Sequence, residues 1–133
     1  MLSSSVELLY EVEPAIVLME PELMKTVFIN VLDNARKSIE GSGQVWLTGK
    51  KENEGYVVII RDSGKGMEQK ELDKITDAFY MVDKSRSRKQ GGAGLGLAIC
   101  HEILMLHGFS ISFESEVNKG TIVKITMKEQ SDE

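Results

Sequence analysis

The chain has 133 residues, of which 41% are hydrophobic and 28% charged, as expected of a single globular domain rather than a disordered chain. Its apolar runs are shorter than the roughly 18 residues of a membrane span, no signal-peptide pattern stands at its start, and its single cysteine, Cys100, excludes an internal disulfide. The net charge of −5 argues against a general nucleic-acid-binding protein, and the cysteine usage indicates a reducing, cytoplasmic compartment.

The N-terminal part of the chain predicts strands followed by a helix. Residues 6–13 (VELLYEVE) alternate loosely between apolar and polar side chains, which predicts a strand at the edge of a sheet. The apolar run 15–19 (AIVLM) predicts a second, short strand. From Glu20 to about Ser38 the apolar residues recur at helical spacing. The residues that share the apolar face of this helix are Met24, Val27, Phe28, Val31, Leu32, Ala35 and Ile39.

The remainder of the chain predicts two hairpins and two further helices. The expected elements are a hairpin of strands 44–51 and 56–62, a short helix at 67–75, a long loop at 79–92, a long helix at 94–107 and a hairpin of strands 109–115 and 120–128. Residues 1–5 and 129–133 are expected to fray. The pattern predicts that residues 1–133 form one α/β (α+β) two-layer sandwich, in which a mixed, mainly antiparallel sheet of about five strands packs against about three helices.

Three polar side chains form a stripe along the first predicted helix. Asn30, Asn34 and Lys37 are spaced at i, i+4 and i+7, so they lie within about 60° of one another at the border of the apolar face. Such a stripe can be ordinary surface, but asparagine is a poor helix former, and two of them in one row indicate a candidate site. Amide oxygens are hard ligands that suit Mg²⁺, and a lysine one turn away suits a phosphate.

Two glycine-rich segments are candidates for contact with a nucleotide. Asp62 opens the segment DSGKGM, which is either a simple turn or a place where a carboxylate accepts a hydrogen bond from an amino group such as that of adenine. Residues 91–96 (GGAGLG) stand before the second long helix, whose free N–H groups and dipole favour a phosphate. A dinucleotide fingerprint starting at Gly92 meets Leu97 in place of its last glycine, and Lys51 stands where a Walker loop needs serine or threonine.

A basic segment lies immediately before the second glycine run. Residues 81–90 (MVDKSRSRKQ) contain four lysine or arginine residues and one aspartate, so four positive charges minus one negative charge give +3 in an acidic chain. The segment is either a solvated loop without a role or, beside the glycines, a contact for an anionic ligand.

Taken in order, these segments resemble the motifs of the catalytic ATP-binding domain of sensor histidine kinases, a domain of the superfamily that includes gyrase, mismatch-repair and heat-shock-chaperone ATPases. NVLDNARK resembles the N box, DSGKGM the first glycine box, DAFYMVDKSRSR the F box running into a flexible ATP lid at about 81–92, GGAGLGLAI the second glycine box and KGTIVKITM the terminal glycine–threonine motif. The resemblance extends from Val6 to Met127. Ala93 stands where the family often has threonine, which removes one possible hydroxyl contact.

The resemblance implies a site for ATP and Mg²⁺. Asn34 would coordinate Mg²⁺ with help from Asn30, and Lys37 would contact a phosphate. Asp62 would accept a hydrogen bond from the adenine amino group, and Arg86 of the lid would hold the triphosphate. The residues implied in catalysis are therefore Asn30, Asn34, Lys37 and Arg86. The other residues implied in contact with the nucleotide are Gly64, Gly66, Met67, Phe79, Gly92, Gly94, Leu95, Gly96, Leu97 and Thr121.

The residue at position 30 bears on the kind of reaction. The ATP-hydrolysing members, and the related serine kinases that regulate sigma factors, usually have glutamate where this chain has Asn30. A neutral amide cannot take a proton from water or from a serine hydroxyl, whereas a neutral imidazole already offers a lone pair. The sequence therefore favours transfer of the γ-phosphoryl group to a histidine. The alternatives are a serine kinase or anti-sigma factor of the same fold, and a non-catalytic ATP-binding module.

The acceptor histidine is expected outside this chain. His101 and His107 both lie in the second long helix, and His107 before Gly108 matches a helix-ending histidine of the family, for which we expect a structural or capping role. The resemblance implies that the partners are the dimerisation and histidine-phosphotransfer domain of a parent kinase and a downstream response regulator, with no nucleic acid and no membrane contact by this domain. We expect a monomeric, cytoplasmic domain of a homodimeric parent that can be anchored in the bacterial membrane.

Overall fold

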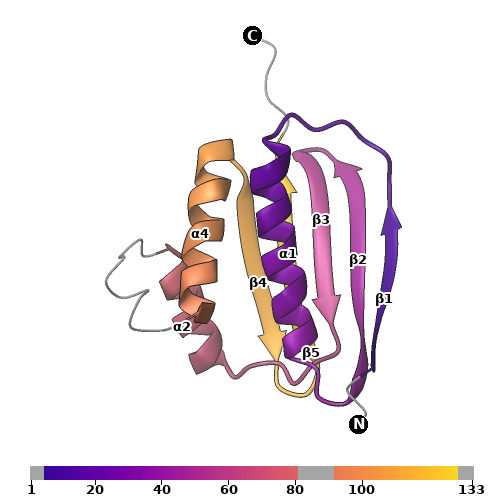
Figure 1. Cartoon of the computed structure of the whole chain (residues 1–133), viewed down its shortest axis with the longest axis vertical. Helices are drawn as coiled ribbons and strands as arrows, with labels where there is room; N and C mark the ends of the chain where they lie inside the picture. Colours follow the sequence, from indigo (N-terminus) through magenta and orange to yellow (C-terminus); the bar gives the residue numbers. More distant parts are fainter. Residues whose placement is uncertain (1–4, 81–91, 129–133) are drawn as a thin grey trace.

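The structure of the chain is a computed structural model that describes residues 5–80 and 92–128, with only the backbone at 77–80 and 92–97. The strands are β1 (Ser5–Val12), β2 (Ser42–Glu52), β3 (Gly55–Asp62), β4 (Ser110–Glu116) and β5 (Gly120–Met127). The helices are α1 (Pro21–Lys37), α2 (Gln69–Tyr80) and α4 (Gly92–His107). The strands form one sheet, and these helices lie together on one of its faces (Figure 1), which confirms the predicted two-layer sandwich.

The sheet is mixed, as the sequence predicts. Its strand order is β1-β2-β3-β5-β4, with β1 at one edge. β1 runs parallel to β2 because α1 returns the chain to the end of the sheet at which β1 began, whereas the other neighbouring strands are antiparallel. The predicted edge position of the first strand is therefore confirmed.

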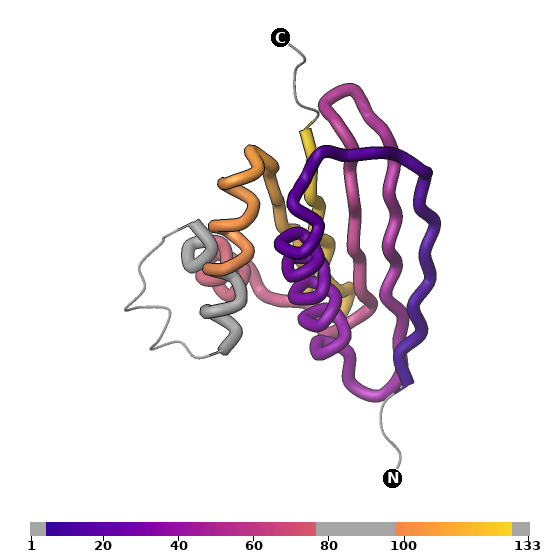
Figure 2. Tube along the Cα trace, turned by 45° about the horizontal axis from the view of Figure 1, so that its top comes forward, coloured from indigo at the N-terminus to yellow at the C-terminus, as the bar shows by residue number. Residues whose placement is uncertain are grey.

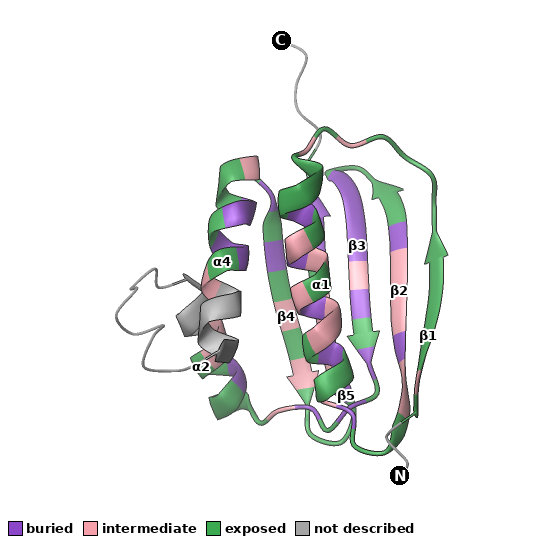
Figure 3. Cartoon of the chain, viewed as in Figure 1, coloured by how far each residue is buried: buried purple, intermediate pink, exposed green. Residues whose placement is uncertain are grey.

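The hydrophobic core lies between the helices and the sheet (Figure 3). Five of the seven residues predicted for the apolar face of α1 and its end are buried, and the other two, Phe28 and Leu32, are half-buried against the core. Burial raises the pKa of the Cys100 thiol to about 11, so this side chain is a neutral part of the core at physiological pH. The largest fully buried side chains are Met24, Val27, Ile60, Cys100, Leu104 and Ile125.

The predicted short strand at residues 15–19 is wrong. These residues belong to the segment that crosses from the end of β1 to the start of α1 (Figure 2). Val17 and Met19 pack against the core, whereas Ile16 is fully exposed. In the described sheet β1 pairs with β2 alone, and residues 15–19 pair with neither edge of the sheet. Val17 and Met19 cover part of the core instead.

The helix α2 is longer than predicted and begins later. It spans Gln69–Tyr80, so Met67 precedes it and Phe79 lies in its last turn rather than in a loop. The backbone N–H of Glu68 donates to Oε1 of Glu71 at 3.2 Å, which satisfies a free donor at the start of the helix. This local cap explains why the helix begins after Met67.

The helix α4 begins at Gly92, two residues before the predicted start. Glycine lowers helix propensity by about 1 kcal/mol per residue, a cost that packing of the rest of the helix against α1 and α2 offsets. Residues 81–91, which hold most of the predicted loop and ATP lid, lie outside the described residues. Among the described residues, no helix is both long and apolar enough to cross a lipid bilayer.

Truncation of a core isoleucine tests this arrangement. Ile60 is 1% exposed, so Ile60→Ala is expected to lower the free energy of unfolding by about 2–5 kcal/mol through lost burial and a cavity. Ile16 is 100% exposed, and the same substitution there is expected to change it by less than about 0.5 kcal/mol. Urea unfolding followed by circular dichroism measures both values, and equal losses would contradict the position of the core.

Candidate functional site

The carboxylate of Asp62 lies at the centre of a set of converging hydrogen bonds. Asp62 ends β3 and is 5% exposed. Its Oδ1 accepts from the Gly64 N–H at 2.8 Å, the Ser38 hydroxyl at 3.0 Å and the Thr121 N–H at 3.3 Å. These donors come from the loop after β3, the end of α1 and the start of β5. Within the described part of the chain the carboxylate's hydrogen bonds all end on Oδ1, which leaves Oδ2 for another donor.

Glycines allow the backbone segments around Asp62 to pack closely. A Cβ at Gly64 would collide with the Ser38 hydroxyl, one at Gly66 with the backbone of β4, and one at Gly120 with the carbonyl of Asp62. Gly66 and Gly120 also have left-handed φ angles of 68° and 98°. The protein's own contacts thus already require glycine at these three positions.

The hydroxyl of Ser115, in β4, connects the first glycine box to the terminal motif. It accepts from the Met67 N–H at 2.9 Å and lies 2.8 Å from Oγ1 of Thr121. It also lies 3.1 Å from the carbonyl of Gly120. Met67 and Thr121, two residues that are far apart in the sequence, are therefore brought together beside Asp62.

The two asparagines of the predicted stripe differ in their surroundings. Asn30 is half-buried, and its Nδ2 donates to the carbonyl of Thr26 at 2.9 Å. Because this hydrogen bond engages the amide nitrogen within the helix, the amide oxygen is the atom of Asn30 that suits a metal ion. Asn34, one turn further on, is exposed. Both residues thus have an amide oxygen that can act as a ligand for a hard metal ion at the surface of α1.

Lys37 belongs to a charge cluster at the end of α1. Its ammonium lies 3.1 Å from Asp33, whose other carboxylate oxygen lies 2.6 Å from the guanidinium of Arg36. Hydrogen bonds from Arg36 and then from Lys37 lower the pKa of Asp33. All three side chains are solvent-accessible, so the attraction is weak, and Lys37 can exchange Asp33 for a more highly charged anion at little cost.

Several predicted site residues, or their side chains, lie outside the part of the chain that the structure describes. Arg86 belongs to residues 81–91, and the side chains of Phe79, Leu95 and Leu97 are not among those described. The backbone of α4 places Gly92, Gly94 and Gly96 in the first turns of that helix. Their predicted contacts with phosphate therefore stay predictions.

Three residues of the cluster were missed by the sequence analysis. Ser38 directly follows the polar stripe and Gly120 is the glycine of the terminal motif KGTIVKITM, so position beside or within a motif is the signal that could have found them. Ser115 carries no such signal, because one serine in a strand resembles any other. Its role depends on the pairing of β4 with β5, where Ser115 faces Thr121.

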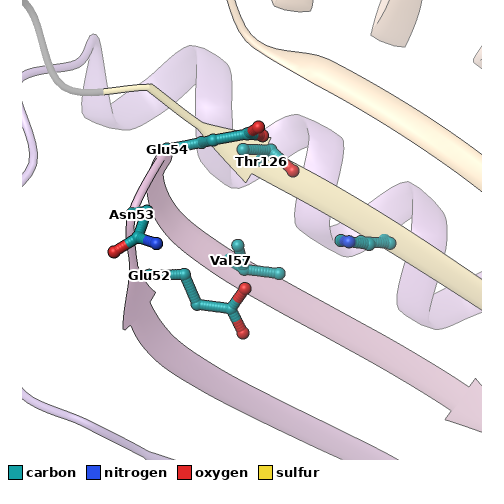
Figure 4. A pocket seen from close by; sticks show the side chains of 6 residues that line it. Glu52, Asn53, Glu54, Val57 and Thr126 are labelled. Atoms are coloured by element: carbon teal, nitrogen blue, oxygen red, sulfur yellow. The ribbon is translucent and has the colours of Figure 1, made fainter.

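A surface cavity of about 520 Å³ lies elsewhere, at the β2–β3 turn and the adjoining parts of β3 and β5 (Figure 4). Its lining residues are Glu52, Asn53, Glu54, Val57, Lys124 and Thr126. Val57 is near the beginning of β3, whereas Asp62 is at its end, so the cavity is separate from the hydrogen-bonded cluster. It includes none of the predicted site residues.

His107 has a structural role, as predicted. Its Nε2 accepts the backbone N–H of Glu20, before α1, at 3.0 Å, so its Nδ1 carries the proton and donates to the carbonyl of Ile103 at 2.8 Å. Its ring also packs against Phe109, with the ring centres 5.1 Å apart. His107 thereby joins the end of α4 to the beginning of α1. His101 is buried on the same helix.

The sequence of residues 19–131 matches the family of histidine kinase-, DNA gyrase B- and HSP90-like ATPases. The chain belongs to this family. The match includes the polar stripe of α1, the Asp62 cluster and the start of α4. The ATPase fold therefore accounts for the two-layer sandwich and for the order of the motifs along the chain.

Known histidine kinases are similar to this ATPase domain in sequence and in structure. The signal transduction histidine-protein kinase ArlS of Staphylococcus aureus is 42% identical over 107 residues, which are 80% of this chain and 24% of ArlS. The mycobacterial sensor histidine kinase MprB has a TM-score of 0.74 and 25% identity, over 92% of this chain and 81% of that chain. The catalytic domain of histidine kinase ThkA has the same fold, with a TM-score of 0.73 and 23% identity over 93% of this chain and 78% of that chain.

The packing of Gly120 against Asp62 can be tested with a matched glycine. Gly41→Ala at φ 80°, with no neighbouring atom within 4 Å, is expected to lower the free energy of unfolding by about 1–2 kcal/mol through the left-handed conformation alone. Gly120→Ala at φ 98° adds a collision with the Asp62 carbonyl and is expected to cost about 1–3 kcal/mol more. Urea unfolding of both variants measures the difference, and equal costs would mean that the close contact is absent.

Proposed function

We propose that this ATPase domain is the catalytic domain of a sensor histidine kinase, which binds Mg-ATP and transfers the γ-phosphoryl group to a histidine on a separate dimerisation domain. The observation that carries the proposal is the buried carboxylate of Asp62, held through one oxygen at the end of the helix that bears Asn30, Asn34 and Lys37. Membership of the ATPase family and similarity to ArlS and MprB support it.

Asp62 reads the base in this proposal. A carboxylate held through Oδ1 offers Oδ2 as an acceptor in a fixed direction, which suits the amino group of adenine. Guanine has a carbonyl at the same position, and that carbonyl would face the carboxylate acceptor to acceptor. Thr121 donates its backbone N–H to the same carboxylate, and its hydroxyl, 2.8 Å from Ser115, would add a second polar contact to the base.

In this proposal the polar stripe of α1, formed by Asn30, Asn34 and Lys37, faces the phosphates. Amide oxygens of Asn30 and Asn34 are ligands of the kind that Mg²⁺ takes, and within the described residues no group of three histidine, cysteine or acidic side chains offers an all-protein metal site. This donor set fits an ion held largely by the nucleotide's own phosphates. When bound, Mg²⁺ would neutralise charge that develops on the transferred group. Lys37 would leave Asp33 and contribute a further positive charge there.

The same residues favour a histidine as acceptor. Asn30 holds its nucleotide-facing oxygen in place by donating from its nitrogen to Thr26, but the amide has no basic atom near pH 7 and cannot activate water or a hydroxyl. An imidazole needs no such activation, because its ring nitrogen already has a lone pair. Positioning and charge neutralisation by this chain are then sufficient for phosphoryl transfer.

The acceptor and the downstream partner belong to the whole kinase in this proposal. This chain spans 24% of the length of ArlS, so other parts of such a protein have room for a dimerisation domain that carries the acceptor histidine. Both ring nitrogens of the half-buried His107 are engaged in joining α4 to α1, and His101 is buried, so neither is placed to receive the phosphoryl group. A response regulator would then receive the phosphoryl group from the dimerisation domain.

Nucleotide selectivity tests the role of Asp62. A hydrogen bond to a charged group contributes roughly 1.5–3 kcal/mol, so Asp62→Ala is expected to weaken ATP binding by about tenfold to 150-fold. The native chain is expected to bind ATP more tightly than GTP, and the variant is expected to lose that preference. Isothermal titration calorimetry gives the dissociation constants, with Asp73→Ala on the exposed side of α2 as a control. Equal binding of ATP and GTP by the native chain would reject the assignment.

Phosphoryl transfer tests the role of α1. Mixed with Mg-ATP and a fragment that carries the acceptor histidine, the chain is expected to form acid-labile phosphohistidine on that fragment and to hydrolyse little ATP by itself. Asn34→Ala is expected to abolish transfer, whereas Asn53→Ala in the β2–β3 turn is not. His101→Ala and His107→Ala are expected to retain the chemistry if they fold. Brisk hydrolysis by the chain alone, or stable phosphate on His101, would contradict the proposal.

A further inference from the structure

The hydroxyl of Ser38 lies between two acceptors. Its Oγ is 2.8 Å from the carbonyl of Ala35 and 3.0 Å from Oδ1 of Asp62. A hydroxyl has one hydrogen, and the carboxylate is the stronger acceptor because it carries a charge. The carbonyl of Ala35 also receives the Ser38 N–H, at 3.3 Å, so it does not depend on the hydroxyl. The hydroxyl proton is therefore directed at Asp62.

Two hydrogen bonds of the Ser38 backbone hold this residue, and with it the hydroxyl, in place. Its N–H donates to the carbonyl of Asn34 at 3.1 Å, and its carbonyl accepts the N–H of Lys65 at 3.1 Å. Ser38 thus ends α1 and holds the loop of the first glycine box at the same time. The side chain has little room to move away, because Gly64 lies so close that a Cβ there would collide with Oγ.

We infer that Ser38 is a positioning residue for base recognition: it orients the Asp62 carboxylate and ties it to the end of the helix that carries the phosphate-facing residues. The inference rests on the proposed function, because it gives Ser38 a role toward the nucleotide only through Asp62. It adds to the proposed function that one residue, Ser38, connects Asp62, which contacts the base, to the helix of Asn34, which faces the phosphates. Asn34 and Asp62 are then held at a constant separation by the chain Asn34–Ser38–Asp62.

The physical consequence is specific to ligands with an amino group. Without the Ser38 hydroxyl, Oδ1 keeps, among the donors in the described part of the chain, the N–H groups of Gly64 and Thr121, of which the second is long at 3.3 Å. The carboxylate can then turn, and Oδ1 competes with Oδ2 for the amino group of the base. A purine that has no amino group at this position makes no bond to Asp62, so its binding does not depend on how the carboxylate is oriented.

Two nucleotides that differ only in this group test the inference. ATP and purine riboside 5′-triphosphate, which has hydrogen in place of the 6-amino group, are titrated with Mg²⁺ into the native chain and its variants by calorimetry. Ser38→Ala is expected to weaken ATP binding roughly threefold to tenfold, as for one lost hydrogen bond, and to leave binding of the analogue unchanged. Ser38→Thr retains a hydroxyl and is expected to restore ATP binding. Ser112→Ala, at an exposed serine of β4, is the matched control.

The outcomes separate this inference from the proposed function. An equal loss for both nucleotides, or no loss for either, overturns the role of Ser38. If Ser38→Ala does not fold, Ser38→Cys keeps the shape with a weak donor and is judged by the same two titrations. Asp62→Ala is measured in parallel. If Asp62→Ala weakens the binding of ATP and of the analogue by the same factor, base recognition by Asp62 is wrong. If Asp62→Ala weakens ATP binding more than analogue binding and Ser38→Ala does not, only the inference about Ser38 is rejected.

Discussion

The site depends on the burial of one carboxylate, because an ionised Asp62 at 5% exposure is tolerated only if donors surround it. Those donors come from the end of α1, the loop after β3 and the start of β5. None of these segments is adjacent to another along the chain, so the carboxylate is satisfied only when the sheet has formed and α1 has docked on it. The stability of the fold and the geometry of the site are therefore linked through the same hydrogen bonds.

The helix α1 serves both the core and the site. One face buries Met24, Val27 and Val31 against the sheet, and the border of that face carries Asn30 and Asn34. Since a helix is stiff over this length, packing of the apolar face determines where the amides lie relative to Asp62. A change in the core beneath α1 would consequently alter the distance between the base-reading and phosphate-facing halves of the proposed site.

The histidines illustrate how the same residue type serves structure rather than chemistry. His107 uses both ring nitrogens, one toward Glu20 and one toward Ile103, and this requires the neutral ring with the proton on Nδ1. Such a ring offers no free nitrogen to a phosphoryl group. This agrees with the division of labour proposed for the kinase, in which the ATPase domain supplies the nucleotide and a separate domain supplies the acceptor. His107 also joins α4, which begins at the second glycine box, to the beginning of α1.

The sequence by itself determined the order of the elements, the apolar face of α1, the edge position of β1 and the motifs that the ATPase family shares, because periodicity, turn residues and motif spacing are local along the chain. Tertiary structure decided that residues 15–19 form no strand, since this segment crosses from the end of β1 to the start of α1 and packs Val17 and Met19 against the core. It also decided the distant partners of Asp62, since Ser38 is 24 residues away and Thr121 is 59 residues away. The contact between Ser115 and Met67 likewise joins residues 48 positions apart. Contacts at such separations depend on how whole elements dock, and no local pattern of residues encodes them.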